Sequence, residues 1–262
     1  MLNTVYRLVE PRRIESEFSD IDVNGDSVLV RPTHLSICNA DQRYFQGTRP
    51  PEVLKKKLPM ALIHEAIGKV IYDPAGDFEP GQKVVMVPNT PMEEDDIVAE
   101  NYLRSSKFRA SGFDGFMQDI VAMRRDRVVA VPDGIDDYVA AFTELVSVSY
   151  HAINRFDRKA HGRRNVLGVW GDGNLAFITS LLLKKRFPES KVYIFGKHEY
   201  KMDDFAFADE TFFIDAIPED LRIDHGFECV GKAGSGTSIN QIIDYINPEG
   251  CIAALGVSED PV

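Results

Sequence analysis

The chain has 262 residues, enough for two modest domains or one large one, and its 44% hydrophobic and 27% charged residues are ordinary for a folded protein. The formal net charge of −11 disfavours binding to a nucleic-acid backbone, because the one tight basic run, Lys55–Lys57, is too short to form a basic patch. The sequence has neither a long apolar run nor a signal-like start, so we expect a cytoplasmic protein without a membrane span.

The three cysteines, Cys38, Cys229 and Cys251, are few, odd in number and widely spaced. This pattern argues against a disulfide framework and agrees with a reducing compartment. It also excludes a zinc module built from four cysteines.

Short β-branched runs dominate the first half of the chain. They are bounded by Gly, Pro and Asp and read SVLVRPTHLSIC at 27–38, IGKVIYD at 67–73, QKVVMVP at 82–88 and RVVAVP at 127–132. Each run is typical of a strand, and regularly spaced short strands predict a compact, partly barrel-like β-domain. We assign residues 1–153 to this domain.

The pattern changes near residue 138. Residues 136–156 keep apolar positions at helical spacing after an acidic start. Strands are then predicted at 165–171, 191–195, 211–215, 225–231 and 250–257, with helices at 175–187 and 238–246. This alternation predicts an α/β domain with a parallel, doubly wound sheet over residues 154–262. About five strands are predicted where such a domain usually has six, so we expect a domain that is incomplete at its C-terminus.

A glycine-rich motif joins the first strand of this domain to its first helix. It reads Gly171-Asp-Gly173-Asn174-Leu175-Ala176. Gly171 permits a tight turn, Gly173 lets the backbone approach a pyrophosphate, and the small Ala176 lets helix and strand pack closely. The free N–H groups and the dipole of the helix N-terminus would hold the pyrophosphate. The motif predicts a dinucleotide site; the alternative is an incidental glycine turn.

The end of the next strand predicts which dinucleotide binds. An acidic residue is expected there when the ribose carries a free 2′-hydroxyl. The strand KVYIF is followed instead by Gly196, Lys197 and His198. Lys197, with His198 or Lys201, could neutralise a 2′-phosphate, which favours NADP(H) over NAD(H). The alternative is that these lysines are ordinary surface residues.

Candidate metal ligands are spread through the β-domain. Cys38, His64, Glu65 and Glu144 offer the thiolate, imidazole and carboxylate groups that zinc takes, and three ligands leave an open catalytic position. Each signal is weak by itself, because a single cysteine is usually a small buried hydrophobe and a single histidine is usually a hydrogen-bonded core residue.

In combination, these segments resemble the medium-chain dehydrogenase/reductase family, the zinc alcohol and polyol dehydrogenases. The matching pieces, together with the glycine turn, cover essentially the whole chain and are Cys38–Asp41, His64–Gly68, Pro80–Val84, Gly112–Gln118 and Glu144–Ala152. The resemblance implies a GroES-like catalytic domain, a Rossmann domain and about 80 further C-terminal residues. It also implies a catalytic zinc on Cys38 and His64, with Glu65 and Glu144 in or beside its shell.

Asp41 resembles the carboxylate that orients the zinc histidine, here His64. Two departures from the family pattern matter. The segment at 89–114 lacks the four cysteines that bind a structural zinc in many members, so we expect one zinc ion and no more. The Ser or Thr that usually passes the alcohol proton is replaced by Ala40. Either a zinc-bound water with Glu144 or a substrate hydroxyl must then relay that proton.

Six longer segments carry a finer resemblance within the family, at 31–47, 58–70, 84–119, 143–156, 170–183 and 224–236. They resemble the ribulose-5-phosphate reductases most. Their resemblance implies reduction of ribulose 5-phosphate to ribitol 5-phosphate with NADPH for teichoic acid or capsule synthesis, and a ribitol-5-phosphate cytidylyltransferase as partner. The substrate phosphate needs cations, and the candidates near the motifs are Arg43, Arg49, Lys107 and Arg109.

Two other functions stay open at this stage. One is an NAD-dependent polyol dehydrogenase acting on an unphosphorylated sugar alcohol, and the other is a non-catalytic dinucleotide-binding regulator. The intact ligand set disfavours the regulator. The sequence leaves the oligomeric state open, although family analogy suggests a homo-oligomer.

Overall fold

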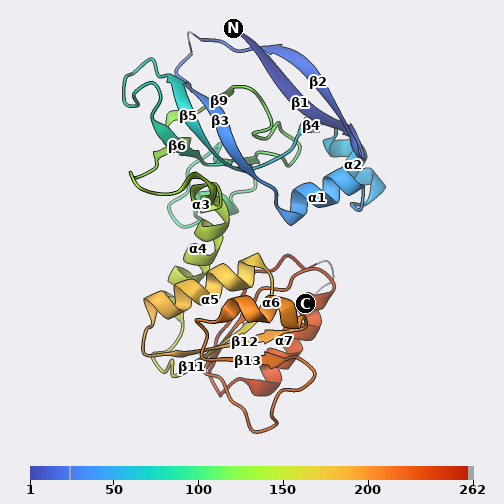
Figure 1. The fold of residues 1–262 in the computed structure, drawn as a ribbon, viewed down its shortest axis with the longest axis vertical. Coiled ribbons are helices and arrows are strands. Elements are labelled where there is room, and N and C mark those ends of the chain that lie inside the picture. The colour runs from blue at the N-terminus through green and yellow to red at the C-terminus, as the bar shows by residue number, and fades with distance from the viewer. Residues whose placement is uncertain (24, 259–262) are drawn as a thin grey trace. The chain divides into compact units, whose positions relative to one another are not determined.

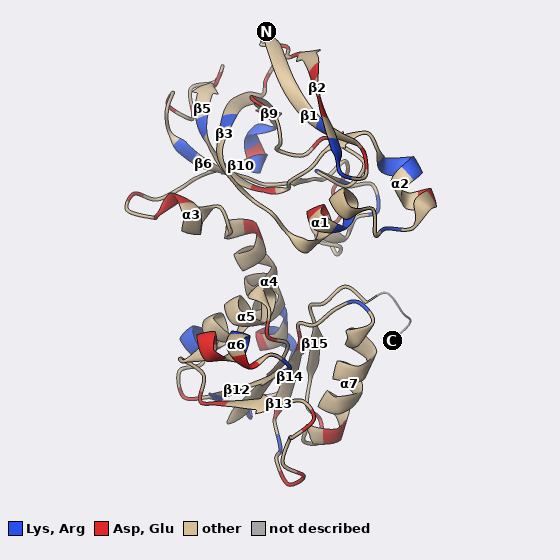
Figure 2. Ribbon diagram, turned by 45° about the vertical axis from the view of Figure 1, so that its right-hand side comes forward, with Lys and Arg blue, Asp and Glu red and all other residues tan. Residues whose placement is uncertain are grey.

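The structure is a computed structural model that describes residues 1–23 and 25–258. The chain forms two compact units, Met1–Glu144 and Leu145–Val262, coloured blue to green and yellow to red in Figure 1. Figure 2 shows acidic and basic residues scattered over both units, with the lysines of α2 (Pro51–Lys57) as a short basic run. Among the described residues, no helix is both long and apolar enough to cross a bilayer.

A five-stranded antiparallel sheet is the centre of the first unit. Its order is β10-β6-β5-β3-β9, formed by Val128–Ala130, Lys83–Met86, Glu65–Tyr72, Val28–Ser36 and Val121–Met123. The inward-pointing side chains of its strands are apolar and buried, among them Val30, Val84 and Met86, and the buried Phe116 belongs to the same cluster. The predicted strands at 27–38, 67–73, 82–88 and 127–132 and the partly barrel-like character are confirmed.

An N-terminal hairpin adds a second, three-stranded sheet to this unit. β1 (Leu2–Glu10) pairs antiparallel with β2 (Arg13–Asp20) on one side and with β4 (Met60–Ala61) on the other. The sequence analysis missed this hairpin, since β2 is a largely exposed edge strand rich in charged residues. Exposed charged residues at a sheet edge carry little hydrophobic periodicity.

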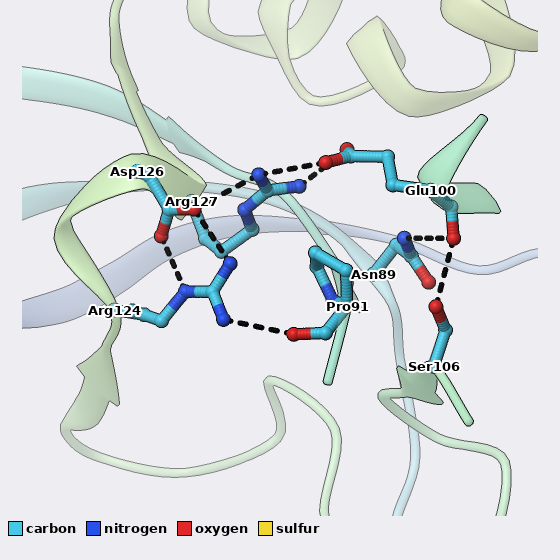
Figure 3. A network of polar contacts seen from close by, with 7 residues as sticks. All are labelled: Asn89, Pro91, Glu100, Ser106, Arg124, Asp126 and Arg127. Atoms are coloured by element: carbon cyan, nitrogen blue, oxygen red, sulfur yellow. Dashed lines mark hydrogen bonds and ion pairs between the residues drawn. The ribbon is translucent and has the colours of Figure 1, made fainter. Parts of the chain in front are cut away.

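The segment from β7 (Asn89–Thr90) to β8 (Lys107–Phe108) forms a lobe that is held by an ion-pair clamp (Figure 3). Arg127 donates to both carboxylate oxygens of Glu100, at 2.5 and 3.0 Å, and to Asp126 at 2.9 Å. Arg124 donates to the carbonyl of Pro91 at 2.9 Å. The clamp therefore connects the lobe to the turn between β9 and β10 without a cysteine.

The segment 136–156, predicted to be helical, contains two helices. α3 covers Asp137–Ala140 and α4 covers Thr143–Lys159. Asp136 caps α3 by accepting hydrogen bonds from the backbone of Tyr138 and Val139 at 2.9 and 3.2 Å. The helical character predicted for 136–156 is confirmed, and apolar spacing does not reveal the interruption at 141–142. The assignment of residues 1–153 and 154–262 to zinc-binding and dinucleotide-binding domains remains a prediction.

The second unit contains a parallel sheet of order β13-β12-β11-β14-β15. These strands are Glu210–Phe213, Lys191–Gly196, Val166–Trp170, His225–Glu228 and Ile252–Ala254. The order reverses between β11 and β14, as in a doubly wound domain, which confirms the predicted fold class.

Helices pack on both faces of this sheet. Leu167 and Val169 of β11 belong to the cluster that includes Ala176 and Leu183 of α5 (Asn174–Arg186), whereas Trp170 packs with Ile242 of α7 (Gly234–Tyr245). Successive residues of a strand point to opposite faces, so strands covered on both sides read as continuous apolar runs. α6 (Glu199–Met202) and a 3₁₀ turn (Asp203–Phe205) follow β12.

We predict that the clamp contributes to the stability of the first unit. Glu100→Ala should lower the free energy of unfolding by about 1–3 kcal/mol, because it leaves the mostly buried guanidinium of Arg127 without its bidentate partner. Denaturant unfolding measures this, with Glu94→Ala as a control that removes another exposed carboxylate of the same lobe. Equal midpoints for the two variants would contradict the prediction.

Candidate metal centre and nucleotide-binding turn

Cys38 is held at the first turn of α1 (Asn39–Gln46). It is the N-cap of this helix, and its Sγ accepts a hydrogen bond from the backbone N–H of Asp41 at 3.4 Å. In return, the Asp41 carboxylate accepts from the backbone N–H of Cys38 at 3.1 Å. This reciprocal capping box fixes the thiol directly after β3 ends.

His64 and Glu65 lie where β5 begins. Ile63, just before them, has a φ of 73°, a left-handed conformation that is unusual for a β-branched residue and is strained by roughly 1–3 kcal/mol. The other carboxylate oxygen of Asp41 accepts from the Ile63 backbone N–H at 2.9 Å. Asp41 therefore links the residue before His64 to Cys38, and its direct action on the His64 ring stays a prediction.

The potential ligand atoms of Cys38, His64 and Glu65 all lie within 4.8 Å of one another. The Cys38 Sγ is 3.9 Å from His64 Nδ1, and His64 Nε2 is 3.9 Å from a carboxylate oxygen of Glu65. Neighbouring ligand atoms on a tetrahedral zinc are about 3.5 Å apart when the bonds are about 2.1–2.3 Å long. The two 3.9 Å distances involve different ring nitrogens of His64, and only one of them can bind the ion. The donor types therefore fit zinc, and the three ligand atoms, within 4.8 Å of one another, must move closer together to bind it.

Burial disfavours the charged forms of these three groups. Burial raises the pKa of the Cys38 thiol, and the charge of Asp41 raises it further. Burial also raises the pKa of Glu65, which is 2% exposed. It lowers the pKa of His64, against the opposing effect of Asp41. All three groups are thus pushed toward their neutral forms, and a bound cation would reverse this for the thiol and the carboxyl.

Glu144, in the first turn of α4, adds a further carboxyl group to this environment. Burial, with the charges of Glu65 and Asp41, raises its pKa to about 7. A carboxyl group that titrates near neutral pH can hold or release a proton under working conditions. Ala40, in the same turn as Cys38 and Asp41, has no group that could do so.

Phe108 is a neighbour of the cluster that the sequence analysis missed. Its ring meets the His64 ring edge-on, with centroids 5.2 Å apart. Phe108 ends β8 of the clamped lobe, so the contact joins residues far apart in sequence. A phenylalanine in a polar loop gives no local signal of such a contact.

The four predicted phosphate ligands differ in accessibility. Arg109 is occupied, because its guanidinium donates to the carbonyls of Asp114 and Ala122 at 3.2 and 2.9 Å. Arg49 lies over the ring of Tyr44, and Lys107 is exposed beside Phe113. Arg43 lies in the last turn of α1. Phosphate binding by these residues stays a prediction, and Arg109 is the least available of them.

The glycine turn of the second unit has the backbone geometry that dinucleotide binding requires. Gly171 has a φ of 128°, and a Cβ there would approach the carbonyl of Cys229 to 3.2 Å and the Cβ of Ala176 to 3.3 Å. Gly173 is the N-cap of α5, where a Cβ would meet no described atom within 4 Å. The free backbone N–H groups at this helix start can therefore be approached by a phosphate.

A cavity of about 460 Å³ adjoins the turn. Gly173, Asn174 and Phe177 line it from α5, and Lys201 and Asp204 line it from the segment after β12. Lys197 and His198, predicted to recognise the cofactor, are exposed at the end of β12. Leu175 is partly buried in the core under α5.

Comparison with known proteins shows the family to which the chain belongs. The family pattern described as "Alcohol dehydrogenase GroES-like domain" matches residues 24–133. The whole chain is 60% identical to 77% of the ribulose-5-phosphate reductase of Bacillus spizizenii, and 58% identical to 77% of ribulose-5-phosphate reductase 1 of Staphylococcus aureus. The chain belongs to the ribulose-5-phosphate reductases within the zinc-type medium-chain dehydrogenase/reductase family.

Solved structures agree with this membership. The crystal structure of S. aureus TarJ in complex with NADPH superposes with a TM-score of 0.87 at 52% identity, covering all of this chain and 75% of that one. L-idonate 5-dehydrogenase of Escherichia coli also reaches 0.87, over all of this chain and 78% of that one, but at 21% identity it supports the fold alone. As a member of this family of oxidoreductases, the chain has the two-part architecture of a GroES-like and a Rossmann domain.

We predict that Cys38→Ser removes tight zinc binding. Zinc binding to the wild-type protein near pH 7.5 should release at least about one proton, because the buried thiol stays protonated until a metal displaces its proton. Calorimetry in buffers of different ionisation enthalpy measures this release. Cys251→Ser is the matched control, since it removes a half-exposed thiol of the second unit. Equal zinc affinity for both variants would contradict the assignment.

Proposed function

We propose that the chain reduces D-ribulose 5-phosphate to D-ribitol 5-phosphate with NADPH at a zinc centre. The observation that carries the proposal is the identity of 56–60% over every residue of the chain with curated ribulose-5-phosphate reductases. The grouping of Cys38, His64 and Glu65 supports it, because buried titratable residues that cluster in this way are typical of functional sites. This grouping also disfavours a non-catalytic regulator.

The cofactors would supply Lewis-acid activation and the hydride, and the chain would supply the groups that bind them. When bound, zinc provides a Lewis acid for a carbonyl oxygen and NADPH provides a hydride. Cys38, His64 and Glu65 would hold the ion. The backbone N–H groups at Gly173 and Asn174 would bind the pyrophosphate, and Lys197 with His198 would bind the 2′-phosphate.

Glu144 is our proposed proton-transfer residue. The product hydroxyl needs a proton, and Ala40 cannot supply one. A buried carboxyl group in the same electrostatic environment as Glu65 can deliver that proton directly or through one water molecule. This proposal selects Glu144 over a substrate hydroxyl as the relay.

The biological setting belongs to the same proposal. A relative named as a ribulose-5-phosphate reductase takes a phosphorylated sugar, so we propose a cytoplasmic enzyme that supplies ribitol 5-phosphate for teichoic acid or capsule precursors. A ribitol-5-phosphate cytidylyltransferase would consume the product. A homo-oligomeric state is proposed by analogy with the family.

The activity is tested by following NADPH oxidation on adding ribulose 5-phosphate to zinc-loaded protein. We expect turnover with this pair and far less with xylulose 5-phosphate, with fructose or with NADH. Reduction of NAD by a free polyol without turnover of ribulose 5-phosphate would instead identify a polyol dehydrogenase.

The proton-transfer role is tested with Glu144→Gln. Turnover should fall by roughly 10²-fold or more, because a general acid typically contributes that much, while the Kd for NADPH stays unchanged. Stopped-flow hydride transfer and equilibrium cofactor titration separate the two effects. An unchanged kcat would place Glu144 outside the mechanism.

A further inference from the structure

The side chain of Asp172, the residue between the two glycines of the turn, reaches to the end of the neighbouring strand. Its Oδ2 accepts hydrogen bonds from the backbone N–H groups of Lys197 and His198, each at 2.9 Å, and contacts His198 Nδ1 at 2.8 Å. The Lys201 ammonium lies 3.8 Å from Oδ1. Two successive backbone N–H groups, an imidazole and an ammonium thus converge on one carboxylate that is 13% exposed.

This arrangement of donors is an anion-binding cradle. Successive backbone N–H groups that point to one place bind phosphates and carboxylates in many proteins. The cradle directly follows β12, and in a doubly wound domain the 2′-position of the adenosine ribose lies at the end of that strand. The groups suited to a 2′-phosphate are therefore already bound to an anion of the protein itself.

The end of β12 itself carries no carboxylate, because its last residue is Gly196. A side chain at Gly196, the last residue of β12, would clash with the Sδ of Met202 at 2.7 Å and approach the Cβ of Asp172 to 3.1 Å. A side chain at Gly196 would therefore require the Met202 side chain to move, and this strand end carries no acidic residue of the kind that usually contacts a ribose 2′-hydroxyl. The Asp172 carboxylate reaches the same strand end from the turn.

Asp172 is ionised in this environment. Partial burial raises its pKa, and the backbone N–H groups of Lys197 and His198, with the His198 side chain, lower it by more, so that its pKa lies below the ordinary value. A second anion cannot accept the same N–H protons while the carboxylate holds them, and two adjacent anions repel each other. A 2′-hydroxyl, in contrast, can donate a hydrogen bond to the carboxylate.

We propose that Asp172 is a specificity-determining residue for the dinucleotide. Its carboxylate occupies the cradle of Lys197, His198 and Lys201, and it must turn away before the 2′-phosphate of NADP(H) binds there. Asp172 therefore weakens NADPH binding and strengthens NADH binding. This inference rests on the proposed use of NADP(H).

Equilibrium titration of full-length, zinc-loaded protein with NADPH and NADH tests the inference. Asp172→Asn removes the charge and keeps an oxygen that can accept from the loop backbone. We expect its Kd for NADPH to fall by about tenfold, which corresponds to the gain of one charge-assisted hydrogen bond over a neutral one. Its Kd for NADH should rise several-fold. Asp204→Asn is the matched control, because it removes a carboxylate that lines the same cavity. It should change the ratio of the two Kd values by less than about twofold.

A second measurement covers the case in which Asp172→Asn disturbs the loop. Addition of 2′-AMP to the wild-type protein should shift the His198 imidazole resonances, since the phosphate displaces Asp172 from the ring, whereas 5′-AMP should leave them in place. A higher Kd for NADPH in Asp172→Asn, equal changes for both cofactors, or an unmoved His198 signal at saturating 2′-AMP would overturn the inference. Failure of ribulose 5-phosphate turnover with wild-type protein would overturn the proposed substrate and leave these binding ratios to decide the role of Asp172.

Discussion

The geometry of the candidate metal centre depends on two hydrogen bonds that the Asp41 carboxylate accepts. One oxygen accepts from the backbone of Cys38 and the other from the backbone of Ile63. One buried side chain therefore fixes the start of α1 and the strained residue before His64 together. Without the Asp41 carboxylate, the left-handed conformation of Ile63 would lose the hydrogen bond that stabilises it. His64 would then no longer be held facing Cys38.

The same carboxylate also shapes the electrostatics of the centre. Asp41 contributes to the raised pKa values of Cys38, Glu65 and Glu144, after burial in each case. The residues that create the geometry thus also gather acidic groups in a buried place, where their neutral forms are favoured. A divalent cation would favour the ionised thiol and carboxyl groups, so the geometry and the acidic groups fit the same kind of occupant.

Sequence reasoning predicted the parts whose signals are local. Strand β12 and the turn at Gly171 follow from short apolar runs and glycine spacing, and Cys38, His64 and Glu65 were named before the structure placed them together. The edge strand β2, the interruption before α4 and the contact of Phe108 with His64 could not be predicted in this way. Each depends on what a residue meets in space, and neither hydrophobic periodicity nor a motif records that.

The clamp of Arg127 and Glu100 has a consequence for metal supply. Where a relative builds its lobe around four cysteines and an ion, loss of that ion or oxidation of those thiols removes part of the scaffold. Here ion pairs and a carbonyl contact connect the lobe to the turn between β9 and β10, and none of these contacts uses a metal ion or a thiol. Removal of zinc by a chelator, or zinc scarcity, would then stop catalysis while the lobe stays folded. Zinc that becomes available again would bind to a protein whose lobe is already folded.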